Sequence, residues 1–276
     1  MAYQTLLDER RGEGGIQWIT LNRPEKLNAI SGTMFRELKE IFERSRRDRT
    51  VRCIVITGAG RAFCAGADFS GSDPIAAHDP QPAQFPEDPN DLEGSRLRFR
   101  VESDAFIALR RLEVPVVACV NGVAVGAGFD MVCACDMAVV STAARFQVAY
   151  VKRGYFADLG GFQTIPRAIG WRKAMEMMMT GNFMSAEELH RYGLSNYLVE
   201  PDQLEERTMQ LARDLEAGPP LAQKLGKTLA YRLADKDFET ALEMSGIALQ
   251  VITPSHDRIE GGRSFREKRE PKFLGR

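Results

Sequence analysis

Two kinds of apolar pattern alternate along much of this 276-residue chain. Short runs of apolar, often β-branched residues are typical of buried strands, and they lie at 16–21, 51–57, 115–120, 137–140 and 198–199. Between them, apolar residues recur every third or fourth position, which predicts helices at 32–47, 97–112 and 129–135. Helical patterns alone follow from about residue 200. The chain is therefore expected to have an α/β core over residues 1–200 and a helical region over residues 201–276.

Local signals indicate where several elements begin and end. Ser31 suits the N-cap of the helix that follows it, and Ser185 with Glu188 has the pattern of a capping box. Gly193 suits the position after that helix, and Gly-Pro-Pro at 218–220 ends a helix predicted for 202–216. Residues 71–94 are rich in proline and acidic residues and show no periodicity, which predicts a mobile surface loop.

The composition argues against several classes of protein. Lys and Arg number 37 and Asp and Glu number 38, so nothing favours a nucleic-acid partner. The N-terminal segment is too polar for a signal peptide, and no apolar run reaches the roughly 18–20 residues that span a bilayer. Five cysteines with no paired spacing are expected to be reduced, and Cys133 and Cys135 are too close together for a zinc knuckle. We expect a cytoplasmic protein with no metal site and no membrane partner.

The glycine turn between residues 115 and 136 is the most informative segment. A buried strand ends at Asn121, and Gly126-Ala127-Gly128 then opens a short apolar helix. Such a turn aims unpaired backbone N–H groups at one point, which can hold a phosphate or a developing oxyanion. Asp130 brings the only ionisable side chain near it. Close packing of strand on helix is the structural alternative, whereas a dinucleotide site would require a different glycine spacing.

Five segments in a fixed order together identify a family resemblance. They read LNRPEKLNAIS (21–31), VITGAGRAFCAGADF (55–69), EVPVVACVNGVAVGAGFDMVCACDMAVVS (113–141), ARFQVAYVKRGYFADLGGFQTIPRAIG (144–170) and SFREKREPKF (264–273). Over nearly its whole length the chain resembles the enoyl-CoA hydratase/isomerase, or crotonase, superfamily. The resemblance implies a spiral of ββα units with a C-terminal helical trimerisation region. It also implies a homotrimer or a dimer of trimers, and an acyl-CoA thioester as substrate with no separate cofactor.

The resemblance places an oxyanion hole at the backbone N–H groups of Ala67 and Ala127. Two such donors stabilise the enolate that forms when a proton leaves the carbon beside a thioester, and each lowers the barrier by about 3–4 kcal/mol. By motif, further residues match segments that contact coenzyme A or the thioester: Lys26, Leu27, Ala29, Ala65, Asp68, Phe69, Ser70, Gly126, Phe265 and Lys268. Phe265 and Lys268 resemble tail residues that often reach the site of a neighbouring subunit. Solvated surface charge is the alternative interpretation of Lys26 and Lys268.

The reaction depends on side chains that vary within the family. Hydratases that resemble this chain hold a water between two glutamates, and the corresponding residues here are Asp130 and Tyr150. A phenol with a pKa near 10 is a poor base at neutral pH, so the usual water addition is disfavoured. Asp158 lies where several isomerases of the family carry a catalytic aspartate.

Asp158 has three interpretations: a base that moves a proton between the α and γ carbons, a nucleophile toward an aryl thioester, or the N-cap of the next helix. Asp130 is a second acid–base group, a polar pocket residue or a structural carboxylate at a helix start. Tyr150 donates a hydrogen bond or shapes the pocket. We expect Asp136 to be structural, and Lys152-Arg153 to be a solvated turn or a contact for an acidic substrate.

The leading hypothesis is an isomerase-type crotonase that shifts a double bond through Asp158. Two alternatives stay open. The first is an enoyl-CoA hydratase that positions water with Asp130 or Asp158, and the second is a non-catalytic trimer that binds acyl-CoA. The acyl group is not indicated by any of these motifs.

Overall fold

The computed structural model describes residues 3–68 and 91–276. A large sheet has the order β1-β2-β3-β5-β7-β10, in which β1 and β2 are antiparallel and the remaining neighbours are parallel. Its strands are β1 (Leu6–Arg11), β2 (Ile16–Leu21), β3 (Cys53–Gly58), β5 (Val116–Val120), β7 (Met137–Ser141) and β10 (Tyr197–Val199). A smaller sheet has the order β4-β6-β8-β9. Its strands are β4 (Ala62–Cys64), β6 (Val123–Val125), β8 (Arg145–Gln147) and β9 (Phe183–Ser185).

Helices follow the strands in a regular sequence. A strand of the large sheet, a strand of the small sheet and then a helix recur as β3-β4-α2, β5-β6-α3 and β7-β8-α4, which confirms the expected spiral of ββα units. The helices are α1 (Gly32–Arg47), α2 (Leu92–Arg110), α3 (Ala127–Ala134), α4 (Gly161–Ile169), α5 (Trp171–Thr180), α6 (Ala186–Arg191), α7 (Leu204–Ala217), α8 (Pro220–Leu233), α9 (Phe238–Ile252) and α10 (His256–Glu267). Short 3₁₀ turns are η1 (Pro24–Lys26), η2 (Ala149–Arg153) and η3 (Pro201–Gln203).

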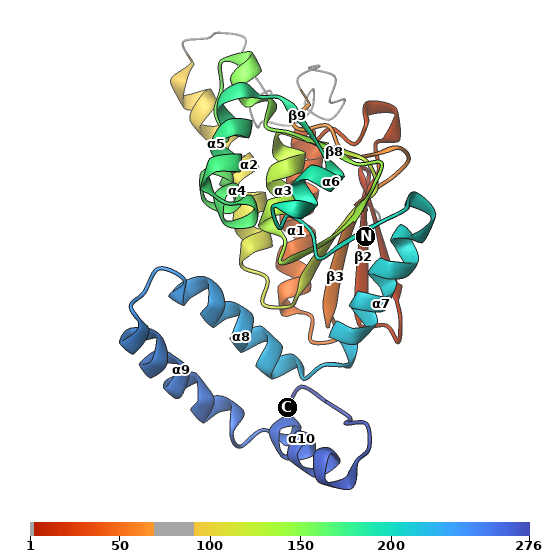
Figure 1. The fold of residues 1–276 in the computed structure, drawn as a ribbon, viewed down its shortest axis with the longest axis vertical. Helices are drawn as coiled ribbons and strands as arrows, with labels where there is room; N and C mark the ends of the chain where they lie inside the picture. Colours follow the sequence, from red (N-terminus) through yellow and green to blue (C-terminus); the bar gives the residue numbers. More distant parts are fainter. Residues whose placement is uncertain (1–2, 69–90) are drawn as a thin grey trace.

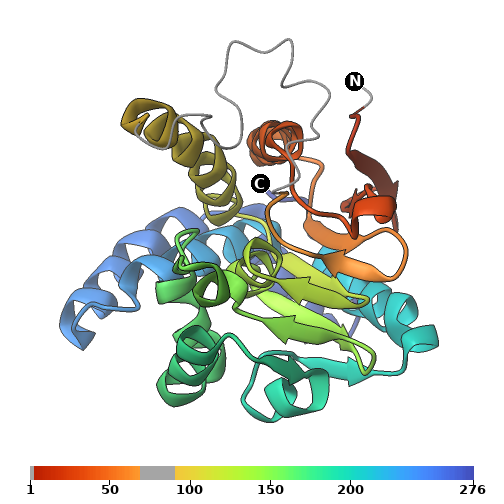
Figure 2. The ribbon, with the colours of Figure 1, turned by 90° about the horizontal axis from the view of Figure 1, so that it is seen from above.

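Both faces of the central strands β3 and β5 are buried, and this explains their continuous apolar runs. On β3, Ile54 and Ile56 face the main core with α1, α2 and α3, whereas Cys53 and Val55 face α7. Figure 2 shows α1 and α2 side by side on one side of the strands. The five cysteines are free, and burial raises the pKa of the Cys53 thiol, so the expectation of reduced cysteines is confirmed.

Most predicted helix ends are confirmed, and one is wrong. Ser31 accepts a hydrogen bond from Met34 N, and Ser185 accepts one from Glu188 N. The helix expected at 97 begins at Leu92 instead, so the last residues of the expected 71–94 loop are helical. The missed signal is Asp91, whose carboxylate accepts the Gly94 N–H and caps the helix. The rest of that loop lies outside the described residues.

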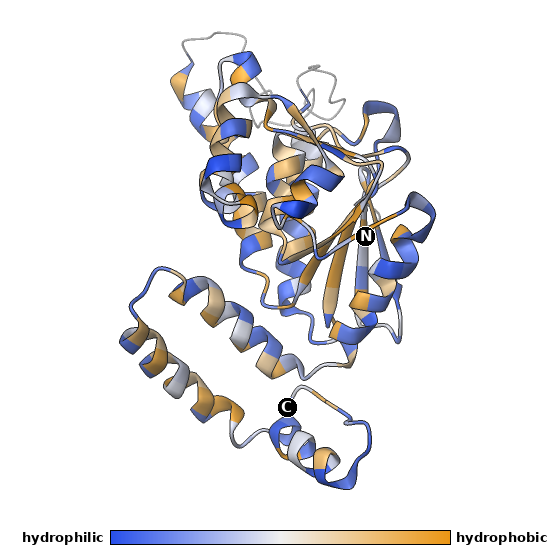
Figure 3. Ribbon diagram, viewed as in Figure 1, coloured by the Kyte–Doolittle hydropathy of each residue, from blue (hydrophilic) through white to orange (hydrophobic). Residues whose placement is uncertain are grey.

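The C-terminal helices extend away from the sheets. Figure 1 shows α8 and α9 side by side at one end of the molecule, with α10 beyond them. Figure 3 shows apolar residues along α9, and its exposed side chains include Phe238, Leu242, Ile247 and Leu249. By contrast, α7 packs against the large sheet through Leu204 and Ala212. Among the described residues, no helix is long and apolar enough to cross a membrane.

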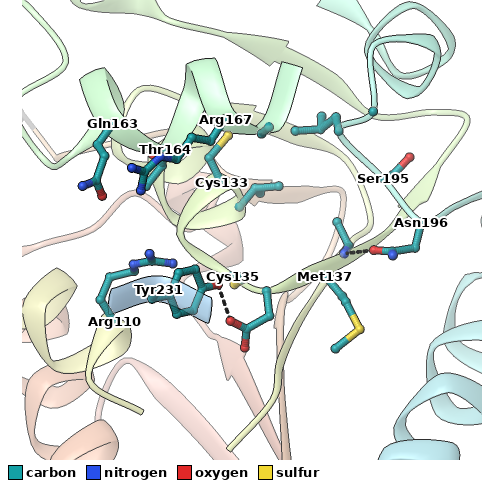
Figure 4. Close-up of a pocket in the computed structure, with 16 residues that line it drawn as sticks. Arg110, Cys133, Cys135, Met137, Gln163, Thr164, Arg167, Ser195, Asn196 and Tyr231 are labelled. Atoms are coloured by element: carbon teal, nitrogen blue, oxygen red, sulfur yellow. Dashed lines mark hydrogen bonds between the residues drawn. The ribbon is translucent and has the colours of Figure 1, made fainter. Parts of the chain in front are cut away.

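Asp136 joins α8 to the core at a cavity of about 300 Å³. Its carboxylate accepts hydrogen bonds from Val116 N at 2.7 Å and from the Tyr231 hydroxyl, and it pairs with Lys227 at 2.6 Å. Figure 4 shows Tyr231 beside Arg110, whose guanidinium lies 3.7 Å from the ring centroid. These contacts support the structural role expected for Asp136.

We expect Asp136→Asn to destabilise the protein by about 3 kcal/mol, because it leaves the Lys227 ammonium buried without its counter-charge. Urea unfolding followed by circular dichroism measures this change. The double variant Asp136→Asn/Lys227→Met should recover part of the loss, since both charges are then absent. An unchanged unfolding midpoint in Asp136→Asn would contradict this role.

Candidate active site

Two segments far apart in the sequence form one ledge. Ala65 N donates to Leu27 O at 2.9 Å, Ile30 N donates to Gly66 O at 2.8 Å, and Asp68 N donates to Ile30 O at 3.0 Å. These bonds hold the segment after η1 beside the segment after β4. The structure thus brings together the two groups of residues for which the sequence predicts contacts to coenzyme A.

Two polar side chains stabilise this ledge. Asp68 is buried, and its carboxylate forms an ion pair with Arg23 at 2.8 Å within the protein. Asn28, which sequence reasoning missed, donates to Ala59 O and Ala62 O, each at 2.8 Å. It adopts a positive φ of 57°, which asparagine tolerates better than most residues. In the sequence, Asn28 is marked only by its place in the run Leu27-Asn28-Ala29 before Ile30.

The Ala67 and Ala127 peptide groups lie close to each other. The bridge between Ile30 and Ala67 uses the N–H and C=O of Ile30, which leaves the Ala67 N–H directed away from it. Ala127 is the first residue of α3, so its N–H has no partner within the helix. A Cβ on Gly66 would lie 3.8 Å from Ala127 N, which shows how near the two turns are. Neither N–H has a hydrogen-bond partner among the described residues.

Glycines permit this approach. Gly126 caps α3 with a φ of 52°, a left-handed conformation that favours glycine. A side chain at Gly128 would collide with the carbonyl oxygen of Cys64, so only glycine lets α3 pack against the end of β4. The geometry can therefore direct two backbone donors and the N-terminus of α3 toward one oxygen atom.

Asp130 and Tyr150 form a buried pair beside this point. The Tyr150 hydroxyl donates to Asp130 Oδ2, and the ring lies 3.7 Å from where a Cβ on Gly126 would be. Asp130 is only 1% exposed, and its Oδ1 has no hydrogen-bond partner in the described chain. Burial raises the pKa of Asp130 to about 7, and burial with the nearby Asp130 carboxylate raises the pKa of Tyr150. Tyr150 is therefore a neutral donor and not a base.

Asp158 lies ahead of α4 and is half-buried. The N-cap of α4 is Gly160 and no side chain caps the helix, so the interpretation of Asp158 as its N-cap is wrong. Gly160 adopts a φ of 91°, and this left-handed turn separates Asp158 from the helix start. Burial raises the pKa of Asp158, and Arg98 opposes that rise. Asp158 lines a cavity of about 360 Å³ together with Phe106, Ile107 and Leu159.

A further carboxyl group, Glu102 of α2, was missed by sequence reasoning. It is 9% exposed, burial and the Asp158 carboxylate raise its pKa, and its own carboxylate adds to the rise in the pKa of Tyr150. No motif marks Glu102. In the sequence it is only one of several charged residues along the predicted helix. No group of three or more side chains within the described residues could hold a metal ion.

The remaining residues predicted for the site differ in exposure and in their distance from α3. Lys26 is exposed, Leu27, Ala29 and Ala65 are half-buried, and Lys152-Arg153 form an exposed turn. Phe69 and Ser70 lie outside the described residues. Phe265 is 84% exposed on α10 and Lys268 ends that helix, far from α3 of the same chain in Figure 1. The structure therefore does not bring Phe265 and Lys268 to the site of their own chain.

We expect the pH dependence of folding to reveal Asp130. Its pKa is raised from 3.8 to about 7 in the folded protein, so between about pH 4 and 7 the unfolded chain has lost a proton that the folded one keeps. Wild-type stability should fall with rising pH in that window, by at most about 1.4 kcal/mol per pH unit from this group. Asp130→Asn lacks this contribution, so its stability relative to wild type should increase from pH 4 to 7. A constant difference in urea unfolding would show that Asp130 is ionised in the folded state.

Comparisons with known proteins agree on one family. The sequence model described as enoyl-CoA hydratase/isomerase matches residues 11–276. The chain is 34% identical to (E)-benzylidenesuccinyl-CoA hydratase of Thauera aromatica, over 94% of this chain and 96% of that protein. It is also 34% identical to 1,2-epoxyphenylacetyl-CoA isomerase of Escherichia coli, over 96% and 97%. A crystal structure of an enoyl-CoA hydratase from Mycobacterium smegmatis superposes with a TM-score of 0.86 at 33% identity, over 98% of each chain.

Proposed function

This chain belongs to the enoyl-CoA hydratase/isomerase family, and from that premise we propose that it is an enoyl-CoA isomerase that shifts a double bond through Asp158. One observation carries the proposal. Asp158 is a half-buried carboxyl group with a raised pKa at an apolar cavity, whereas position 150 holds a tyrosine whose hydroxyl donates to Asp130. The carboxyl group suited to accept a proton is therefore Asp158.

The proposed reaction has two proton transfers. The Asp158 carboxylate removes a proton from the α carbon of a 3-enoyl thioester, and the electron pair moves onto the thioester oxygen as a dienolate. The Ala67 and Ala127 N–H groups donate to that oxygen, where the negative charge develops. A proton is then delivered to the γ carbon, which leaves the double bond between the α and β carbons. The raised pKa of Asp158 makes it a stronger base than a solvated aspartate.

The same features disfavour water addition. A water held between two carboxylates donates a hydrogen bond to each of them. At position 150 the Tyr150 hydroxyl is itself a donor, and its hydrogen bond goes to Asp130. The relatives nevertheless include a hydratase by name as well as an isomerase. We therefore treat a hydratase that uses Asp130 or Asp158 as the alternative that the experiment must separate.

The substrate is proposed to be an acyl-CoA thioester whose nucleotide lies along the ledge of residues 26–30 and 65–68. Because Phe265 and Lys268 lie far from this ledge, we propose that they reach the site of another copy in a trimer. The exposed apolar side chains of α9 support such an assembly. Sedimentation velocity of the full chain tests it, and a monomer at micromolar concentration would contradict it.

The test of function is product analysis on matched panels of 3-enoyl-CoA and 2-enoyl-CoA thioesters. We expect conversion of 3-enoyl to 2-enoyl thioesters in both directions, without incorporation of ¹⁸O from labelled water. Formation of ¹⁸O-labelled 3-hydroxyacyl-CoA as the main product would replace the isomerase by a hydratase. Binding of these thioesters without turnover of any of them would favour the non-catalytic alternative.

A further inference from the structure

Glu102 is a buried carboxyl group to which no hydrogen bond is made within residues 3–68 and 91–276. It lies on α2 and is 9% exposed, and no described residue donates a hydrogen bond to it. Arg98 on the same helix forms an ion pair with it, and its Nε lies 3.8 Å from Glu102 Oε1. That distance is an ion pair at the limit of contact and is too long for a hydrogen bond. A buried carboxyl group that no described residue bonds is available to a bound molecule.

The surroundings of Glu102 are those of the proposed active site. Arg98 Nη2 lies 3.4 Å from the Tyr155 hydroxyl, and Tyr155 N donates to Tyr150 O at 2.9 Å, so α2 lies against the segment that ends at Asp158. The Asp158 carboxylate adds to the rise in the pKa of Glu102, so the two groups are near each other. The next residues on the helix, Ser103 and Phe106, line the same cavity as Asp158. Glu102 lies one helical turn from Arg98 and one from Phe106, so it is on the face of α2 that is turned toward the segment carrying Asp158.

We propose that Glu102 is the second acid–base group of this site, which delivers the proton to the γ carbon after Asp158 has removed one from the α carbon. This proposal rests on the proposed isomerase function. It assigns the acid that delivers the second proton, a role for which Tyr150 is unsuited. The charges balance at each step. Asp158 becomes protonated as the dienolate forms, Glu102 becomes a carboxylate as the γ carbon gains its proton, and transfer of a proton from Asp158 to Glu102 restores both.

The pKa of Glu102 suits its role as the proton donor. Burial raises the pKa of Glu102 to about 7, the Asp158 carboxylate adds to the rise, and Arg98 opposes it. Tyr150, which donates to Asp130, is a further titratable group near Glu102, and Arg110 and Arg111 line the cavity at Asp158. On the neighbouring helix α1, Lys39 pairs with Asp104 at 2.7 Å. Glu102 therefore holds its proton up to about pH 7, where it can still donate it, while the less buried Asp158 accepts one.

The experiment compares Glu102→Gln with Glu93→Gln, a control at an exposed position of the same helix. Glutamine matches the size and the neutral charge of a protonated glutamate, so the fold should be retained, and thermal unfolding checks this. With the 3-enoyl-CoA that wild type isomerises fastest, we expect kcat of Glu102→Gln to fall by about 100-fold or more. Exchange of the α proton with D₂O should continue near the wild-type rate. Glu93→Gln should match wild type in both measurements.

The pH profile separates a proton donor from a structural residue. Wild-type kcat should fall as the pH rises through about 7, where Glu102 loses its proton, and Glu102→Gln should lack this decrease. Glu102→Asp should recover part of the turnover and the decrease with pH. If Glu102→Gln keeps wild-type turnover while Asp158→Asn loses it, the Glu102 role is overturned and the isomerase proposal stands. If wild type isomerises no thioester, both proposals fall together.

Discussion

Asp158→Asn is expected to lower isomerase turnover by about 10²–10⁴-fold, the usual contribution of a positioned acid–base group. Asparagine keeps the size of the side chain and its place at the cavity, but it cannot accept the α proton. Because the proposed oxyanion hole and the ledge proposed to hold coenzyme A are untouched, KM should stay near the wild-type value. The loss should therefore fall on kcat, and α-proton exchange with D₂O should be lost together with isomerisation.

Two comparisons make this result specific. Asp235→Asn changes an exposed aspartate that pairs with Arg167, and it should leave turnover unchanged. Asp130→Asn removes the other aspartate, which is buried and bonded to Tyr150, and whose pKa burial raises to about 7. We expect a smaller loss from Asp130→Asn than from Asp158→Asn. Full activity in Asp158→Asn would exclude Asp158 as the base and would leave Asp130 as the remaining aspartate at the site.

The sequence predicted the parts of the site that are built from local backbone geometry. A glycine that needs a left-handed φ, as at Gly126, and a helix that begins at the next residue are encoded by neighbours in the chain. The same holds for the caps at Ser31 and Ser185. The local pattern indicated only a glycine turn that opens a helix, and the resemblance of the motifs then implied Ala67 and Ala127 as the two donors; the structure places the two turns together.

Features that depend on packing between distant segments could not be predicted in the same way. The sequence shows Asp130 and Tyr150 as separate residues, and only the fold makes the tyrosine a hydrogen-bond donor to the aspartate. Glu102 resembles any charge on an amphipathic helix until α2 lies against the segment that carries Asp158. The error at Asp158 has a similar origin, because aspartate often caps helices, yet the turn at Gly160 takes that position here.

Ala127→Pro is expected to lower kcat by about 10²–10³-fold, because it removes one of the two backbone donors proposed to hold the thioester oxygen. The first position of a helix is where proline is best tolerated, since its missing N–H has no partner within the helix. The substitution therefore removes the donor without breaking a hydrogen bond of α3, and circular dichroism should show an unchanged helix content. The loss should appear in α-proton exchange and in isomerisation alike, since both pass through the same enolate.

Ala127→Ser is the matched control, because serine keeps the backbone N–H and also suits a helix start. If the Ala127 N–H acts only in packing, proline and serine should have similar effects on turnover, and their difference therefore measures the donor itself. A second comparison separates the donor from the base. In Asp158→Asn the enolate is not formed, so adding Ala127→Pro should cost far less than it does in wild type. Independent, multiplicative losses in the double variant would instead mean that Ala127 and Asp158 do not act on the same intermediate, and the proposed reaction would have to be abandoned.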